Sequence, residues 1–183
     1  MMIRPILFGI GTIVFLYLSR NSIKNPRAHG FYRFFAFEGI LLLVLINHPR
    51  WFSNPFSPLQ LVSWVLLGAS IFFVINALLL LKKHGGHAQR QDAPENFSFE
   101  NTVMVVEEGL YRYVRHPMYS SLLFLAWGAF CKQITPLNIG LVALVTVMLI
   151  AAAKIEEREN INFFGSAYTE YMKRSRLFIP FVL

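Results

Sequence analysis

The sequence has 183 residues, of which 55% are hydrophobic and 15% charged, and its mean hydropathy is +0.49. Soluble domains are about 45–50% apolar and about 25% charged, so this composition excludes an ordinary soluble domain and indicates a membrane protein. The net charge of +7 comes from basic residues between apolar runs, which favours an anionic membrane surface over nucleic acid as the partner. The single cysteine, Cys131, excludes an internal disulfide and a cysteine-rich metal site.

Five apolar runs predict an all-α, polytopic membrane protein, because crossing the hydrocarbon core takes about 20 apolar helical residues. In chain order the runs are about Met1–Ser19, Phe34–Asn47, Leu59–Leu81, Met118–Cys131 and Pro136–Ala153. We expect the first to be a retained helix rather than a cleaved signal, since it lacks a clean cleavage site. The short second and fourth runs can be tilted, re-entrant or paired as a hairpin.

The basic residues give these five runs a direction. Fourteen of the 17 lysines and arginines lie between the first and second runs, between the third and fourth, and after the fifth; the others are Arg4, Arg50 and Lys132. The positive-inside rule then predicts an outside N-terminus and a cytoplasmic C-terminus. We expect one membrane domain over 1–183, with a three-helix part (1–95) followed by a helical hairpin and polar tail (96–183).

The densest group of chemically capable side chains is the stretch 107–119, just before the fourth run. It contains Arg115 and His116, and Pro117 restricts His116 to an extended or turn conformation. Pro117 also suits the first turn of a helix, whose N-terminus favours a nearby anion. Taken alone, the stretch is equally typical of a basic, aromatic anchor at the membrane interface.

Two further stretches follow the fifth run. In 154–160, Glu156 shares a helix face with Glu159 and Asn160, and acids this close to a membrane helix are costly unless solvated or paired. A solvated helix end with local Glu–Arg pairs is the plain alternative. The stretch 163–173 is rich in aromatic residues, and Gly165 is expected to break the helix there.

The order of these pieces along the chain is more specific than any one of them. They are Gly109-x-Tyr111, Arg115-His116-Pro117-Met118-Tyr119, an apolar hairpin, Glu156-Glu157, Phe164-Gly165-x-x-Tyr168-x-x-Tyr171 and Ile179-Pro180. The set resembles the isoprenylcysteine carboxyl methyltransferase family, with phospholipid N-methyltransferases as more distant relatives. The resemblance covers about 96–180, nearly half of the chain.

The resemblance implies a multi-pass membrane enzyme that binds S-adenosyl-L-methionine in a cytoplasmic, non-Rossmann pocket and releases S-adenosyl-L-homocysteine. No Gly-x-Gly-x-x-Gly follows a strand-like segment, which agrees with this expectation. The implied cofactor contacts are Tyr111, His116, Pro117, Met118, Tyr119 and Glu156, with Asn96, Val103, Val105 and Val106 where the local match is weaker. The implied catalytic residues are Arg115, His116 and Glu156, and the implied substrate contacts are Glu157, Asn160 and Tyr168.

These residue types suit the implied cofactor. A carboxylate such as Glu156 can hold its amino group, and His116 or a helix N-terminus can hold its carboxylate. Its sulfonium is a cation that tyrosine faces and carbonyl oxygens favour. Methyl transfer is an in-line displacement, so positioning and water exclusion can supply most of the catalysis. A carboxylate acceptor needs no general base, whereas an amine must lose a proton, which His116 or a glutamate would accept.

One position departs from the family pattern and leaves the acceptor open. The prenylcysteine enzymes carry an arginine one helical turn before the first glutamate, and Ala152 stands there in this sequence. The leading hypothesis is methyl transfer to a lipid or lipid-modified acceptor that enters sideways from the bilayer. One alternative is phospholipid amine N-methylation, and another is a non-enzymatic small membrane protein or transporter.

Other polar residues carry less weight. Glu38 in the second run is either interfacial or functional, and Asn76 in the third is expected to form an interhelical hydrogen bond. His84 and His87 have a spacing that can bind metal, but without a carboxylate partner they predict no metal site. The oligomeric state and the host membrane stay open.

Overall fold

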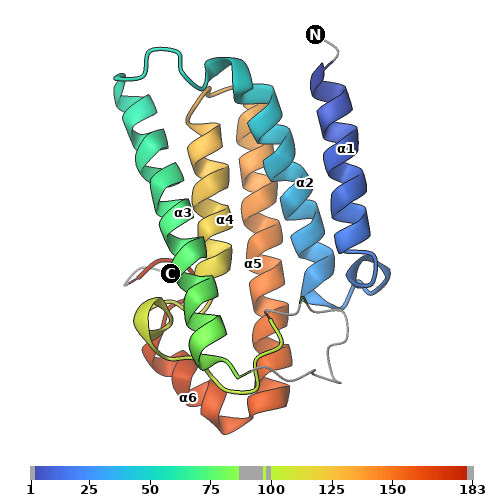
Figure 1. The fold of residues 1–183 in the computed structure, drawn as a ribbon, viewed down its shortest axis with the longest axis vertical. Helices are drawn as coiled ribbons and strands as arrows, with labels where there is room; N and C mark the ends of the chain where they lie inside the picture. Colours follow the sequence, from blue (N-terminus) through green and yellow to red (C-terminus); the bar gives the residue numbers. More distant parts are fainter. Residues whose placement is uncertain (1–2, 87–96, 98–99, 181–183) are drawn as a thin grey trace.

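The computed structural model describes residues 3–86, 97 and 100–180, and this part of the chain is helical without strands. Five helices pack side by side in one bundle (Figure 1): α1 (Ile3–Leu18), α2 (His29–Asn47), α3 (Pro58–His84), α4 (Pro117–Phe130) and α5 (Pro136–Phe164). Helix α6 (Ser166–Arg174) folds back at one end, called the α6 end here. Short 3₁₀ helices cover Ser22–Lys24, His48–Arg50 and Gly109–Arg112.

Each of the five predicted runs is a helix, and one of them begins earlier than its apolar run. α2 begins at His29 instead of Phe34, while α5 continues beyond its apolar run, through the polar stretch 154–160, to Phe164. Hydropathy detects only the lipid-soluble part of a helix, whereas backbone hydrogen bonding continues into its polar turns. α5 ends at Gly165, whose φ of 61° is a conformation that glycine adopts without a steric penalty, so the predicted break is confirmed.

Helix length separates the bundle into two groups. The helical segments that contain α2, α3 and α5 are long and apolar enough to cross a membrane. α1 has 16 residues and α4 has 14, and a 14-residue helix is only about 21 Å long. Because the hydrocarbon core is about 30 Å thick, α2, α3 and α5 are each long enough to reach across it, whereas α1 and α4 are shorter than the core.

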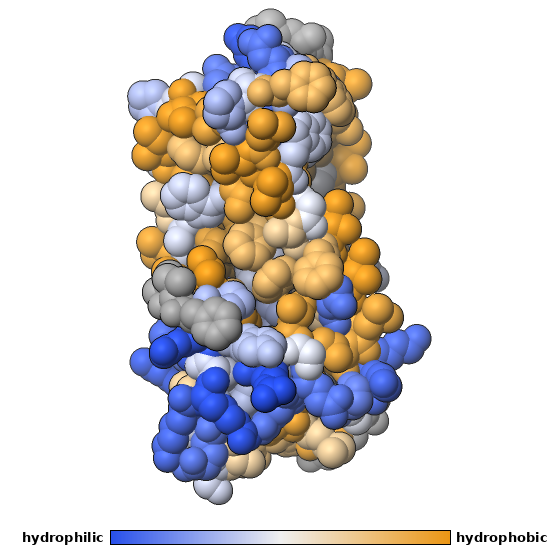
Figure 2. Space-filling view, turned by 90° about the vertical axis from the view of Figure 1, so that its left-hand side faces the viewer, coloured by the Kyte–Doolittle hydropathy of each residue, from blue (hydrophilic) through white to orange (hydrophobic). Residues whose placement is uncertain are grey.

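The surface divides by polarity along the bundle. Figure 2 shows hydrophilic residues gathered at the α6 end and apolar residues over most of the rest of that face. Along α1 and α3, apolar side chains such as Ile13 and Val65 are about 70% exposed. Such extended apolar exposure is what a lipid-facing surface requires.

The apolar core lies between α2, α4 and α5. Leu43, Val145 and Leu149 are fully buried there. Gly39 lets α2 approach α5, because a Cβ at this position would lie 2.5 Å from a methyl carbon of Val145. Small residues at helix contacts allow the close packing on which membrane bundles rely.

Two polar residues within the apolar helices, Glu38 of α2 and Asn76 of α3, form hydrogen bonds. Glu38 accepts a hydrogen bond of 2.8 Å from Thr12 of α1, so it links two helices. The interhelical bond expected for Asn76 is wrong: its amide donates to the carbonyl of Phe72, one turn earlier in α3, at 2.8 Å. Only 17% of the apolar window of α3 is buried, so few neighbouring side chains are available to Asn76 and it bonds to its own helix.

Candidate active site

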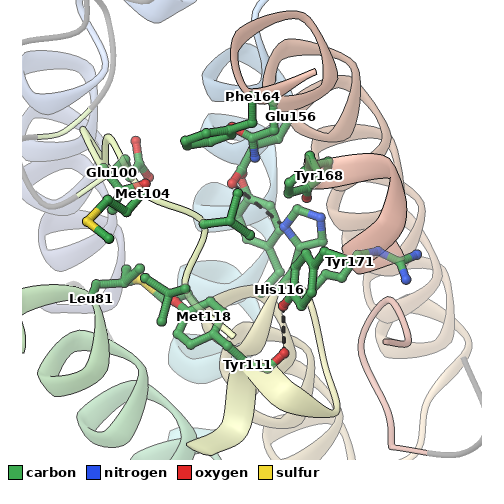
Figure 3. A pocket seen from close by; sticks show the side chains of 16 residues that line it. Leu81, Glu100, Met104, Tyr111, His116, Met118, Glu156, Phe164, Tyr168 and Tyr171 are labelled. Atoms are coloured by element: carbon green, nitrogen blue, oxygen red, sulfur yellow. Dashed lines mark hydrogen bonds and ion pairs between the residues drawn. The ribbon is translucent and has the colours of Figure 1, made fainter. Parts of the chain in front are cut away.

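A cavity opens at the α6 end, with about 730 Å³ of space including its mouth. Five segments line it: the end of α3, the segment 100–106, the segment 111–119, the polar half of α5, and α6. Figure 3 shows side chains from all of them converging on one space.

Most of the sequence-predicted site residues line this cavity. They are Val105, Val106, Tyr111, Arg115, His116, Met118, Tyr119, Glu156, Asn160 and Tyr168. Three others lie beside it: Pro117 is buried in the first turn of α4, Glu157 is buried next to Arg115, and Val103 is 40% exposed. Asn96 lies outside the described residues. The structure therefore brings together stretches that the sequence separates by a helical hairpin.

The turn before α4 is fixed by glycine geometry and by the C-terminal segment. Gly109 has a φ of 55°, and a Cβ on it would lie 2.8 Å from Leu80 of α3. Any other residue would therefore strain this turn. The backbone N–H of Arg115 donates to the carbonyl of Arg176 at 2.7 Å, and that of His116 donates to Leu177 at 3.2 Å. These contacts aim the His116 side chain into the cavity from the N-terminus of α4.

His116 is buried between two carboxylates without bonding to either. Its Nδ1 lies 3.7 Å from Glu156 and its Nε2 lies 4.0 Å from Glu157. Burial lowers the pKa of His116, and the two glutamates only partly offset this, so the pKa stays below its usual value. Within the described part of the chain, Nε2 has no hydrogen-bond partner. The site therefore contains a neutral imidazole that is available to a ligand.

Arg115 is occupied by the protein itself. Its Nε donates to Glu157 at 2.7 Å, and one of its terminal nitrogens donates to the carbonyls of Met172, at 3.2 Å, and Ser175. The other carboxylate oxygen of Glu157 accepts from Lys154 at 2.9 Å. These contacts tie α5 to the end of α6, which is how a positioning residue acts; the catalytic role predicted for Arg115 stays a prediction.

Three tyrosines form one side of the cavity. Tyr111, Tyr168 and Tyr171 are each less than 8% exposed, and the Tyr171 hydroxyl donates to the carbonyl of Tyr111 at 2.6 Å (Figure 3). Burial raises the pKa of all three hydroxyls above the usual value, so they stay neutral. Neutral phenol rings provide faces that attract a cation.

Two carboxylates line the cavity, and sequence reasoning found only one of them. Glu156 projects from α5, while Glu100 lies across the cavity from Tyr168 and Tyr171 (Figure 3). Burial raises the pKa of Glu100, but Arg33 and His29 lower it by more, so the pKa stays below its usual value. The carboxylate is therefore ionised at neutral pH. Glu100 belongs to no motif, and its partners lie some 70 residues earlier in the chain, so no local pattern marks it.

The position where the prenylcysteine enzymes carry arginine is closed to a longer side chain. Ala152 is fully buried in the core cluster of α2, α4 and α5. Among the described residues that line the cavity, Arg115 is the only lysine or arginine, and Glu157 already binds it. The cavity is therefore anionic and aromatic, which suits a cationic ligand.

The chain is similar in sequence to known methyltransferases. The phospholipid methyltransferase family model matches residues 59–167, which include most of the cavity lining. Methanethiol S-methyltransferase of Pseudomonas deceptionensis is 25% identical over 80% of this chain and 53% of its own length. Methanethiol S-methyltransferase 1 of Bradyrhizobium diazoefficiens is 29% identical over 86% of this chain and 56% of its own length.

A second group of relatives matches a shorter part of the chain. Protein-S-isoprenylcysteine O-methyltransferase B of Arabidopsis thaliana is 34% identical over 43% of this chain and 40% of its own length. Protein-S-isoprenylcysteine O-methyltransferase of Saccharomyces cerevisiae is 29% identical over 45% of this chain and 35% of its own length. The chain spans about half the length of the methanethiol enzymes it matches.

Proposed function

The chain belongs to the phospholipid methyltransferase family, and on this premise we propose that it is a membrane-embedded methyltransferase that uses S-adenosyl-L-methionine. The observation that carries the proposal is the convergence of Tyr111, His116 and Glu156 on one cavity. Tyr111 and His116 precede the α4–α5 hairpin, whereas Glu156 lies in the polar half of α5. A purely interfacial anchor would not need to gather them around one cavity.

The lining residues suit the cofactor by their charge and chemical type. The cofactor would supply a methyl group activated on a sulfonium. Glu156 can accept hydrogen bonds from its ammonium, and the N-terminus of α4 with His116 can hold its carboxylate. The faces of Tyr111 and Tyr168 favour the sulfonium. The buried walls exclude water, so the chain contributes mainly orientation and a dry environment.

We propose a hydrophobic acceptor that carries an oxygen or sulfur nucleophile. The relatives are named as S- and O-methyltransferases, so phospholipid amine methylation and a transport or non-enzymatic role are not favoured. A lipid or lipid-modified acceptor would reach the cavity sideways from the bilayer, with the α6 end facing the cytoplasm.

A small thiol, in place of a lipid-like acceptor, is the second candidate, and the structure gives a reason for it. Ala152 provides no cation to hold a prenylcysteine carboxylate. A thiol instead needs a group that accepts its proton, and the buried, neutral His116 has an Nε2 without a partner among the described residues. His116 would then act as the general base.

Binding of S-adenosyl-L-homocysteine, measured by calorimetry on the detergent-solubilised chain, tests the cofactor site. We expect Glu156→Gln to weaken binding at least about tenfold, because a charge-assisted hydrogen bond is lost. Glu170→Gln is the matched control, since Glu170 is exposed on α6 and pairs only with Lys173 among the contacts described. Folded wild-type protein that fails to bind would overturn the proposal.

A methyl-transfer assay then separates the acceptors. The protein is incubated with methyl-labelled cofactor and, in parallel, a small thiol, a prenylcysteine analogue and phosphatidylethanolamine vesicles. Label in the thiol or the prenylcysteine analogue supports the proposed O- or S-transfer. Label in phosphatidylethanolamine alone would reject it.

A further inference from the structure

A buried network of charged residues joins α2 to the wall of the cavity. Arg33 pairs with Glu100, and Nε2 of His29 lies 3.7 Å from the same carboxylate. Nδ1 of His29 lies 2.6 Å from Glu159 of α5, whose other oxygen accepts from the backbone N–H of His29 at 3.2 Å. The side chains of His29 and Arg33 are 2–3% exposed and that of Glu100 is 13% exposed.

The network also organises the segment around Glu100. The Glu100 carboxylate accepts a 2.9 Å hydrogen bond from the backbone N–H of Phe97, and the Arg33 guanidinium lies 4.1 Å from the centre of the Phe97 ring. The backbone carbonyl of Glu100 accepts from the N–H of Thr102, which itself lines the cavity. Fixing Glu100 therefore fixes the start of the 100–106 wall.

The two α2 residues lie outside the part of the chain that the family model matches. The match begins at residue 59, whereas α2 ends at Asn47. Within the described residues, the family part supplies most of the cavity lining but not the cations that hold Glu100 in place. The contacts give α2 a part in the site as well as in the bundle.

We propose that His29 and Arg33 are positioning residues of the active site, which hold Glu100 and the 100–106 wall against the cofactor cavity. This inference rests on the proposed function. It assigns α2 to the active site, and it names Glu100 as a second carboxylate that faces the cationic cofactor alongside Glu156.

Electrostatics explain why the cavity needs these cations behind its wall. Two carboxylates that line one cavity repel each other, and burial strengthens the repulsion. Arg33 lies close enough to interact electrostatically with Glu156 and Tyr119 as well as with Glu100. Without Arg33, Glu100 would be a buried charge with a weakened set of partners, which is strongly unfavourable. The segment would then move outward or Glu100 would take up a proton, and either change removes a carboxylate from the cavity.

The test measures affinity for S-adenosyl-L-homocysteine and thermal stability in the full detergent-solubilised chain. The variants are Arg33→Met, Arg33→Lys, Glu100→Gln and the double variant Arg33→Met/Glu100→Gln. Arg27→Met is the matched control, because Arg27 is an exposed arginine in the turn before α2. Affinity is measured on folded protein, so a residue that only supports the fold would lower the melting temperature and leave affinity unchanged.

We expect Arg33→Met and Glu100→Gln each to weaken binding at least about tenfold, with Arg27→Met unchanged. The double variant should be no weaker than the worse single one, because both changes break the same contact. Arg33→Lys should recover part of the affinity, since it keeps the charge. Should Arg33→Met fail to fold, Glu100→Gln carries the test alone. Wild-type affinity in folded Glu100→Gln or Arg33→Met would overturn the inference, whereas a wild type that does not bind would overturn the proposed function instead.

Discussion

At the scale of single residues, His116 shows how position converts an ordinary side chain into a candidate site residue. Pro117 fixes it at the start of α4, Tyr119 stacks on it with ring centres 5.5 Å apart, and Phe178 packs against its edge. The two nearby glutamates lie too far away for hydrogen bonds. The imidazole is thus rigid, dry and neutral, which are the conditions that a proton acceptor or a ligand contact requires.

The buried imidazole predicts how stability depends on pH. Burial places the pKa of folded His116 below the value of about 6.5 that an unfolded histidine has. The unfolded state therefore binds the proton more readily, so this contribution to stability is complete above about pH 6.5 and is lost as the pH falls below it. The melting temperature of the wild type should drop more between pH 6.5 and pH 5 than that of His116→Gln. Parallel curves for the two proteins would contradict this prediction.

At the scale of elements, the segment after α6 is part of the site rather than a loose tail. Val114 and Arg176 form a parallel bridge, and the hydroxyl of Ser120 donates to the carbonyl of Phe178 at 2.6 Å. The Phe178 side chain is 2% exposed. Arg115 joins this segment to Glu157 of α5. The α6 end therefore closes around the cavity through contacts among α5, α6 and the turn before α4.

The two cations bound to Glu157 should differ sharply in their contribution to stability. Arg115 is about one-tenth exposed, and its loss leaves a buried carboxylate with a single surface partner, so Arg115→Met should cost about 3–5 kcal/mol. Lys154 is 54% exposed, so Lys154→Met should cost at most about 1 kcal/mol. Unfolding free energies from denaturant titration of the micellar protein measure both. Equal losses for the two variants would show that burial does not govern this cluster.

The same elements show what sequence reasoning could reach. Hydropathy located all five helices, and proline and glycine marked the start of α4 and the end of α5, because those signals act within a few residues. The start of α2 was placed five residues too late, since its polar first turn carries no hydropathy signal. Glu100 and Arg33 were missed because each is meaningful only beside the other, and chain topology alone brings them together. The ordered motifs predicted most of the residues that line the cavity. Isolated charged residues could not be assigned to it from the sequence.

At the scale of the whole molecule, the bundle is polar at one end and apolar along its length, which gives it a preferred orientation in a membrane. The α6 end carries the candidate site together with Lys173, Arg174 and Arg176, whereas the opposite end carries the turns after α2 and α4 (Figure 1). In that opposite end, Lys132 is buried against Trp64, its Nζ 3.4 Å from the centre of the ring. Because Lys132 is covered, its positive charge is not exposed at that end of the bundle.

Cysteine labelling tests the orientation that follows from this asymmetry. In a Cys131→Ala background, single cysteines replace Phe52, which is 78% exposed between α2 and α3, and Lys173, which is exposed on α6. With the α6 end in the cytoplasm, a membrane-impermeant maleimide should label the Phe52→Cys protein in intact cells and the Lys173→Cys protein only after permeabilisation. The reverse pattern would place the candidate site outside. Labelling of both from one side would contradict the bundle itself, because α3 then could not cross the membrane between them.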